Sequence, residues 1–189
     1  MPRSGNPLTL KRAVFLDRDG VINTAILKNN RPYPPASLSE LRVLPGVSSA
    51  LEKLRSWDFE IVVITNQPDI ARGVVNKALV DEINNALTSL LGIKYFYVCP
   101  HDDGDNCDCR KPKPGLIIGA AADLRINLAE SFVVGDRWRD ISAGQAAGCT
   151  CFFIDYSYDE KPPTTPYLSV KSLSEAVELI VRDYDATVS

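Results

Sequence analysis

Histidine and methionine are almost absent from this sequence, which has one of each, and it contains no long apolar run. Without a stretch approaching the ~18 apolar residues that a membrane helix needs, we expect no membrane span. Residues 1–12 are polar and lack the apolar core of a signal peptide, which favours a cytoplasmic location. A formal net charge of −3 excludes a general nucleic-acid binder, whose surface would be strongly basic.

The scarcity of histidine also limits the chemistry. His101 lies among Cys99, Cys107 and Cys109, so acid–base chemistry elsewhere must use carboxylates or lysines. In a reducing cytosol, a Cys/His cluster favours a metal site over a disulfide framework. Three thiolates and one imidazole are the donor set of a closed, structural Zn²⁺ site. A redox pair or unrelated buried cysteines are the alternatives.

Length and composition are those of an ordinary globular protein. The chain has 189 residues, of which 45% are apolar and 24% charged. No internal repeat, low-complexity tract or linker divides it. We therefore expect one domain over residues 1–189, with its core at about 13–182, and a monomer.

Short apolar runs alternate with amphipathic stretches, a pattern typical of parallel strands connected by helices. Strands are predicted at residues 13–16, 60–65, 93–98, 131–134 and 151–154. Helices are predicted between them, one with Leu79, Ile83, Leu87 and Leu90 on its apolar face, and one with Pro114 in its first turn. A last helix begins near Ser172, whose spacing to Glu175 resembles a capping box. Residues 24–35 and a proline-rich stretch ending at Pro166 are predicted loops.

Polar side chains follow three of these strands where each strand ends. Asp17-Arg18-Asp19 follows the first, Thr65-Asn66 ends the second, and Asp136 with Asp140 follows the fourth. Because ligands bind at the carboxyl ends of strands in an open α/β sheet, these residues are expected in one site. A solvated turn is the plain alternative for a single pair of acids.

Phosphoryl transfer is the chemistry that needs such a set. Asp17 is the expected nucleophile, and Asp19 the expected general acid and base. Because several carboxylates would repel a phosphate, the site requires a divalent cation, and Mg²⁺ prefers oxygen ligands. We expect Asp17, Asp136 and the backbone carbonyl of Asp19 to bind it. Thr65 and the fixed cation Lys111 are expected to hold the phosphate oxygens.

Asp140 and the loop with the Cys/His cluster have supporting roles in this prediction. Asp140 is expected to orient the metal ligands or Arg137 rather than to bind the metal. The loop that carries His101, Cys107 and Cys109 is called the zinc loop below. It is expected to fix Arg110 and Lys111 over the phosphate, because both follow Cys109 directly.

The set Asp17-Arg-Asp19-Gly20, Thr65-Asn66-Gln67, Lys111-Pro112 and Gly135-Asp136…Asp140 resembles the four motifs of the haloacid dehalogenase superfamily of phosphatases. The resemblance spans residues 13 to about 155. It implies a Rossmann-like fold with helices on both faces of the sheet, magnesium and an aspartyl-phosphate intermediate. Because no segment between the motifs is long enough for a separate cap domain, it also implies a capless enzyme. A non-catalytic, zinc-bearing binding domain on the same fold is the alternative from another class.

The zinc loop and the Ile70-Ala-Arg72-Gly73 segment are similar to those of the D-glycero-D-manno-heptose 1,7-bisphosphate phosphatases. The histidinol-phosphate phosphatases share the zinc loop, and the short interval between His101 and Cys107 is as in those enzymes. The resemblance thus implies a small phosphorylated substrate, with removal of the 7-phosphate of the heptose as the leading reaction and histidinol-phosphate hydrolysis as the alternative.

A bisphosphate substrate needs a cationic seat for its second phosphate. Arg110 is the first candidate, because a guanidinium can hold a phosphate by two bonds. Arg137 follows, and then Arg72 or Lys28. Asn66 is also expected to bind substrate.

Overall fold

The computed structural model describes residues 10–188, with side chains as far as Arg182, so most of the N-terminal stretch discussed above lies outside it. Six parallel strands form one sheet in the order β5-β4-β1-β6-β7-β8. The strands are β1 (Arg12–Leu16), β4 (Phe59–Asn66), β5 (Tyr95–Cys99), β6 (Phe132–Gly135), β7 (Thr150–Ile154) and β8 (Leu168–Val170). The α/β prediction, with a parallel sheet, is confirmed.

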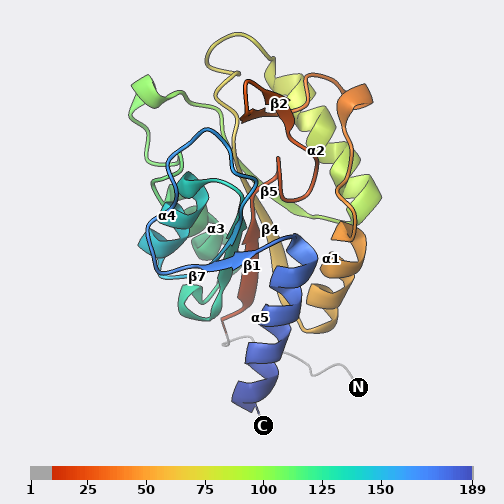
Figure 1. Cartoon of the computed structure of the whole chain (residues 1–189), viewed down its shortest axis with the longest axis vertical. Helices are drawn as coiled ribbons and strands as arrows, with labels where there is room; N and C mark the ends of the chain where they lie inside the picture. Colours follow the sequence, from red (N-terminus) through yellow and green to blue (C-terminus); the bar gives the residue numbers. More distant parts are fainter. Residues whose placement is uncertain (1–9, 189) are drawn as a thin grey trace.

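Helices cover both faces of this sheet (Figure 1). They are α1 (Val47–Ser56), α2 (Lys77–Leu91), α3 (Gly115–Leu124), α4 (Trp138–Ala147) and α5 (Leu173–Val188). Alternate residues of the central strand explain the two layers, since Val14 and Leu16 pack with α1, α2 and α5, whereas Ala13 and Phe15 pack with α3 and α4. The four strand residues are fully buried, as expected for a parallel strand covered on both sides.

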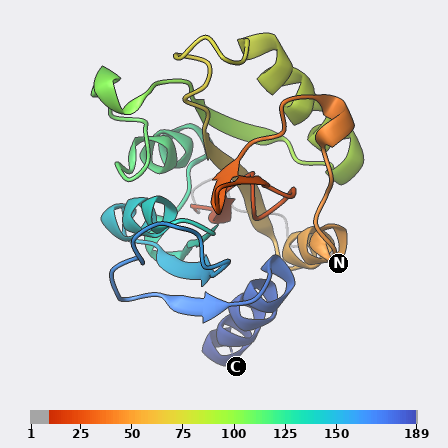
Figure 2. The same cartoon turned by 45° about the horizontal axis from the view of Figure 1, so that its top comes forward.

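Three short strands lie within or just after the two predicted loops, and the sequence pattern did not indicate them. Residues 24–35 include a small antiparallel hairpin, β2 (Ile26–Lys28) and β3 (Arg31–Tyr33), and Figure 2 shows it above the centre of the sheet. β8 follows the proline-rich stretch and pairs with the edge of β7. Both were missed because these strands have three residues each and bury almost none of their side chains.

Helix ends and one helix face also differ from the prediction. Leu90 is 65% exposed, because the buried stripe of α2 runs through Ile83, Leu87 and Leu91 at steps of four residues. Pro114 is the residue before α3 and not its first turn. Ser172 Oγ accepts the N–H of Glu175 as predicted, but the Glu175 carboxylate accepts the N–H of Lys171, so the reciprocal bond is displaced by one residue.

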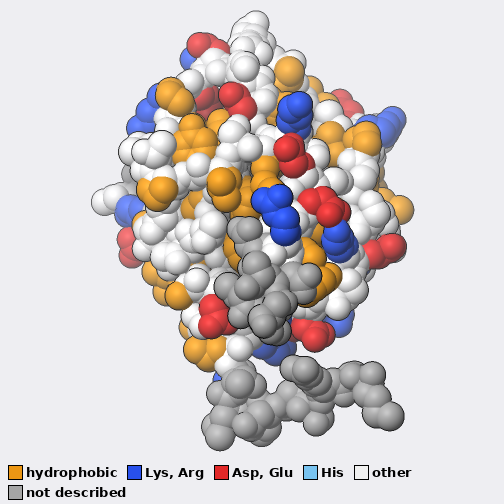
Figure 3. All heavy atoms as spheres, turned by 60° about the horizontal axis from the view of Figure 1, so that its bottom comes forward, with side chains coloured by type: hydrophobic (Ala, Val, Ile, Leu, Met, Phe, Trp, Pro, Cys, Tyr) orange, Lys and Arg blue, Asp and Glu red, His pale blue; other side chains and the backbone are white. Residues whose placement is uncertain are grey.

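None of the helices in the described part of the chain is long and apolar enough to cross a membrane. The end of the molecule where the C-terminus lies has acidic and basic side chains interspersed with hydrophobic ones (Figure 3). The clustered carboxylates and arginines described next lie at the opposite end, where β1, β4 and β6 finish.

Candidate active site

Three neighbouring strands deliver the predicted residues to one place. β1 lies between β4 and β6, and the N–H of Asp17 continues the pairing by donating to Val134 O at 3.0 Å. The loop after β1 therefore lies beside the loop after β6. Gly20, with a φ of +96°, is in contact with Asp136, since a Cβ at Gly20 would lie 1.9 Å from Asp136 Oδ2. Only glycine allows this approach.

Asp17, Asp136 and Asp140 form a buried cluster, with ligand oxygens that all lie within 4.8 Å of one another. Burial, together with the charges of Asp140 and Asp19, raises the pKa of Asp17 to about 6 against the opposing effect of Lys111. Burial and the charges of Asp17 and Asp140 raise the pKa of Asp136 as well. Oδ1 of Asp136 is buried without a hydrogen-bond partner, and the Asp19 carbonyl accepts no backbone hydrogen bond within the described residues. This all-oxygen donor set fits a hard divalent cation such as Mg²⁺.

Lys111 links the cluster to the neighbouring strand. Its ammonium group, which is almost fully buried, lies 2.9 Å from Asp17 Oδ1, 2.6 Å from Asp140 Oδ1 and 2.7 Å from Ile64 O. Its three N–H donors thus have three acceptors. The charges of Asp140 and Asp17 outweigh the effect of burial and raise the pKa of Lys111. Lys111 is therefore a permanent cation beside the expected nucleophile.

The side chain of Asn66 contacts the backbone of Lys111. Its Nδ2 donates to Lys111 O at 3.0 Å, and its Oδ1 accepts the Lys111 N–H at 3.1 Å. Both of its polar groups thus hold the loop that carries the lysine. Asp140 likewise accepts the N–H of Arg137 at 2.9 Å, in addition to its ion pair with Lys111.

Asp19 is held by donors from three places. Arg18, which is fully buried, donates to both of its oxygens at 3.0–3.3 Å. Asn23 Nδ2 and Gln67 Nε2 each donate at 2.9 Å. Gln67 also donates to Thr65 Oγ1 at 2.9 Å, so one amide connects two predicted catalytic groups. No role was predicted for Arg18, Asn23 or Gln67, although Arg18 and Gln67 lie inside the motifs and Asn23 lies three residues after the first motif.

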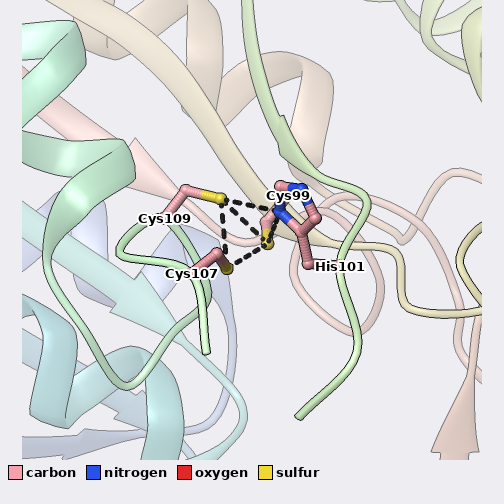
Figure 4. A group of neighbouring side chains, drawn as sticks. All are labelled: Cys99, His101, Cys107 and Cys109. Carbon is pink, nitrogen blue, oxygen red and sulfur yellow. Dashed lines mark hydrogen bonds between the residues drawn. The ribbon is translucent and has the colours of Figure 1, made fainter. Parts of the chain in front are cut away.

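The Cys/His residues form a second cluster, at the end of β5 (Figure 4). Their donor atoms are 3.1–3.7 Å apart in the five pairs Cys99–His101, Cys99–Cys107, Cys99–Cys109, His101–Cys109 and Cys107–Cys109. Bonds of ~2.0–2.3 Å to a central ion give tetrahedron edges of about 3.3–3.8 Å. Burial raises the pKa of Cys107, but hydrogen bonds from Cys109, the Arg110 N–H and Cys99 outweigh it and lower that pKa to about 7. The donor set and its spacing fit a tetrahedral zinc ion.

A cleft of about 330 Å³ opens over the carboxylates. Of the residues predicted from the sequence, it is lined by Asp17, Asp19, Thr65, Asn66, Arg72, Arg110, Lys111, Arg137 and Asp140. The hairpin, residues 68–72 and the zinc loop contribute to its border. Arg137, Arg139 and Asp140 also line it, as does Glu160 in the stretch after β7, for which no role was predicted.

Arginines of the cleft are paired with carboxylates. Arg72 makes two bonds to Asp102, at 2.6 and 2.7 Å, and Arg137 pairs with Glu160. Arg110 Nε and Arg139 Nη1 both donate to Asp103 Oδ1, at 2.8 and 3.1 Å. Arg139, on the first turn of α4, was not predicted; its position two residues after Arg137 in the Asp136 motif is the signal that could have found it.

Lys28 is outside this group of cations. It does not line the cleft, and its ammonium group lies over the ring of Tyr33, 5.3 Å from the centroid. The thiols of Cys149, just before β7, and Cys151, within β7, are buried, and burial raises the pKa of each to about 12.

Comparison with known proteins gives consistent matches. A D-glycero-beta-D-manno-heptose-1,7-bisphosphate 7-phosphatase of Bordetella bronchiseptica is 34% identical over 151 residues, which cover 76% of this chain and 80% of that protein. The protein of the same name from Helicobacter pylori is 32% identical over 181 residues, covering 92% and 99%. The crystal structure of the B. bronchiseptica D,D-heptose 1,7-bisphosphate phosphatase, complexed with magnesium and phosphate, has a TM-score of 0.78 at 27% identity, covering 91% of this chain and 99% of that one.

The model of the haloacid dehalogenase-like hydrolases matches residues 24–148. This span ends after Asp136 and Asp140 and includes Thr65, Lys111 and the Cys/His cluster. With that match and with relatives at 32% and 34% identity over most of their length, the chain belongs to the haloacid dehalogenase-like hydrolase family.

Proposed function

We propose that this chain is a Mg²⁺-dependent phosphatase that removes the 7-phosphate of D-glycero-D-manno-heptose 1,7-bisphosphate through an aspartyl-phosphate intermediate. The observation that carries the proposal is the contact of Lys111 with both Asp17 and Asp140 beside the unpartnered Asp136 oxygen. The names and lengths of the relatives support the heptose substrate. The interval of five residues between His101 and Cys107 keeps histidinol phosphate as the second candidate.

Asp17 and Asp19 each act in both chemical steps. A carboxylate oxygen of Asp17 attacks phosphorus, and the bond from phosphorus to the sugar oxygen breaks as Asp19 gives its proton to the departing alkoxide. In the second step Asp19 takes a proton from water, whose oxygen attacks phosphorus, and the bond to Asp17 breaks. Both aspartates return to their starting states, and the products are inorganic phosphate and the dephosphorylated alcohol.

Other residues of the chain position the phosphoryl group. Lys111 and the hydroxyl of Thr65 hold its equatorial oxygens as charge spreads over them. Asp17, Asp136 and the Asp19 carbonyl would hold the magnesium ion, and the chemistry that such an ion supplies is neutralisation of charge on the phosphoryl oxygens. Because Asp17 must be ionised to attack, the pKa of about 6 in the metal-free protein makes an added positive charge beside it favourable.

We place the second phosphate of the substrate at Arg110 and Arg139. Both guanidinium groups border the cleft and both contact the same oxygen of Asp103. Asp103 is 58% exposed, so its carboxylate can be exchanged for a phosphate oxygen at little cost. Arg72 and Arg137, by contrast, each make paired bonds to one carboxylate. Two guanidinium groups facing one phosphate would distinguish a bisphosphate from a monophosphate.

Phosphate release from the heptose bisphosphate and from histidinol phosphate, each with magnesium, tests the proposal. We expect kcat/KM to be higher for the bisphosphate, and Asp17→Asn to reduce it at least 1,000-fold by removing the nucleophile. Asp81→Asn, which changes an exposed carboxylate on α2, is the matched control and should be neutral. A preference for histidinol phosphate would overturn the heptose assignment, and no Mg²⁺-dependent turnover of any phosphomonoester would favour the binding domain.

Alanine at Arg110 or Arg139 tests the seat of the second phosphate. Losing a charged hydrogen bond costs about 1.5–3 kcal/mol, or roughly 10–100-fold, and we expect that factor in KM for the bisphosphate. The heptose 7-monophosphate, which lacks the second phosphate, is the internal control and should show little change. Equal effects on both substrates would contradict this placement.

A further inference from the structure

Four consecutive residues after β7, Ser157–Glu160, join two parts of the site that are far apart in the sequence. Asn30, at the turn of the β2–β3 hairpin, donates from Nδ2 to Ser157 O at 2.9 Å and accepts the Asp159 N–H at 3.0 Å. Asp159 also pairs with Arg31 at 3.3 Å, although both side chains are well exposed and such a pair adds little. The hydrogen bonds of Asn30 therefore provide the link to the hairpin.

The alternate residues of this segment face the loop after β6. Tyr158 Oη donates to Asp136 Oδ2 at 2.9 Å, and the Glu160 carboxylate holds the guanidinium of Arg137. The 157–160 segment thus binds the hairpin through one set of residues and the motif after β6 through the other.

The hydrogen bond from Tyr158 gives the two Asp136 oxygens different environments. Oδ2 accepts the phenol, and its other side is against Gly20. Oδ1 is buried and has no hydrogen-bond partner. A carboxylate accepts only, so the phenol must be the donor. Without this bond the carboxylate could turn about its last torsion and exchange the two oxygens.

We infer that Tyr158 is a positioning residue for the divalent cation, because its hydroxyl fixes Asp136 Oδ2 and leaves Oδ1 directed to the metal. The inference rests on the magnesium site of the proposed function. It adds that the 157–160 segment makes the affinity of that site depend on the hairpin, since Asn30 holds the segment in place. A cleft-bordering hairpin and a metal ligand are thereby connected through Tyr158.

Binding of Mg²⁺ to the protein without substrate, measured by calorimetry, tests this role. Residues that orient a metal ligand typically contribute 10–100-fold to affinity, so we expect Tyr158→Phe to weaken Mg²⁺ binding about tenfold or more. At saturating Mg²⁺, KM for the substrate should remain unchanged and kcat close to that of the wild type. Tyr156→Phe is the matched control: its ring packs against Tyr158 at 5.6 Å, and its hydroxyl bonds to none of the described residues.

Two glycine variants test the link to the hairpin. Asn29 and Asn30 both have positive φ, of 51° and 56°, so glycine preserves either backbone conformation. Asn30→Gly removes the bond to Ser157 and should weaken Mg²⁺ binding in the same direction by a smaller factor. Asn29→Gly should not.

The outcomes separate the inference from the function on which it rests. Unchanged Mg²⁺ affinity in Tyr158→Phe, with binding by the wild type, overturns the role of Tyr158 alone. Unchanged affinity in Asn30→Gly overturns the link to the hairpin. A wild-type protein that binds no Mg²⁺ overturns the proposed function as well.

Discussion

At Lys111, a single ammonium group faces three buried carboxylates, of which it contacts Asp17 and Asp140 directly. If all are ionised, the cluster has an excess of two negative charges on buried side chains. Burial raises the pKa values of Asp17 and Asp136, and the neighbouring carboxylates add to that rise. A divalent cation would balance the two excess negative charges, so the charge of the cluster supports the proposed magnesium site.

Replacing Lys111 by methionine should affect activity and stability together. We expect kcat/KM to fall at least 1,000-fold, because the phosphoryl oxygens lose a fixed cation. Removal of one partner from a buried pair typically costs about 3–5 kcal/mol, so the free energy of unfolding in urea should also fall.

Lys113→Met is the matched control for that change. Lys113 lies two residues along the same loop, is 43% exposed and pairs with Asp108, which is almost fully exposed. We expect wild-type activity and stability. Activity retained in Lys111→Met that folds normally would contradict the role of Lys111.

Residue type and strand position predicted which side chains meet, but not their hydrogen-bond partners. Asn66 lines the cleft and stays a predicted substrate ligand, but its contact with the Lys111 backbone, 45 residues along the chain, was not predicted. Arg137 was a candidate phosphate ligand, and it pairs with Glu160 of the stretch predicted to be a plain loop. Such partners depend on how distant loops fold together, which one sequence does not reveal.

At the scale of elements, the zinc loop differs from the rest of the fold. Residues 100–114 form no regular strand or α-helix, and Cys107 and Cys109 pack only at the border of the apolar core. The same loop carries Arg110 and Lys111 into the cleft. Its shape must therefore depend on the Cys/His cluster more than on hydrophobic packing.

Loss of zinc should therefore disable the site and spare the sheet. We expect about one zinc per chain in the wild type and none in Cys107→Ser, because a tetrahedral site needs all four ligands. The variant should retain its far-ultraviolet circular dichroism, lose amide protection in residues 100–114, and have a higher KM and a lower kcat.

Cys149→Ser, at a buried thiol beside β7, is the matched control and should keep its zinc and its activity. Full activity in a zinc-free protein would refute the structural role of the metal.

The length of each strand decided whether the sequence could predict it. The five strands expected from apolar runs are all present, because the apolar side chains of each strand pack against the helical layers. β8 and the hairpin strands, of three residues each, depend on pairing with neighbours and leave no apolar pattern. The hairpin nevertheless lies above the centre of the sheet, at the end where the site is (Figure 2). The least predictable segment therefore borders the site.

For the whole molecule, the buried carboxylates connect folding stability to pH and to magnesium. Burial raises the pKa of Asp17 from 3.8 to about 6 in the folded, metal-free protein. The folded state then binds more protons than the unfolded state between these two values, so stability is greatest below the lower one and is lost as the pH rises through the upper one. Asp136 acts in the same direction.

We therefore expect the protein, dialysed free of magnesium with its zinc retained, to lose stability between pH 5 and pH 7.5 and to regain it when Mg²⁺ is added. A shift from 3.8 to about 6 corresponds to at most about 3 kcal/mol. Asp136→Asn removes one of the competing charges and keeps an acceptor for Tyr158, so without Mg²⁺ at pH 7.5 it should be more stable than the wild type by roughly 1–3 kcal/mol. It should gain nothing from added Mg²⁺. Urea denaturation of both proteins at the two pH values, with and without Mg²⁺, measures these differences. A wild-type stability that does not change with pH, together with an Asp136→Asn variant that is no more stable, would show that the three carboxylates do not destabilise one another.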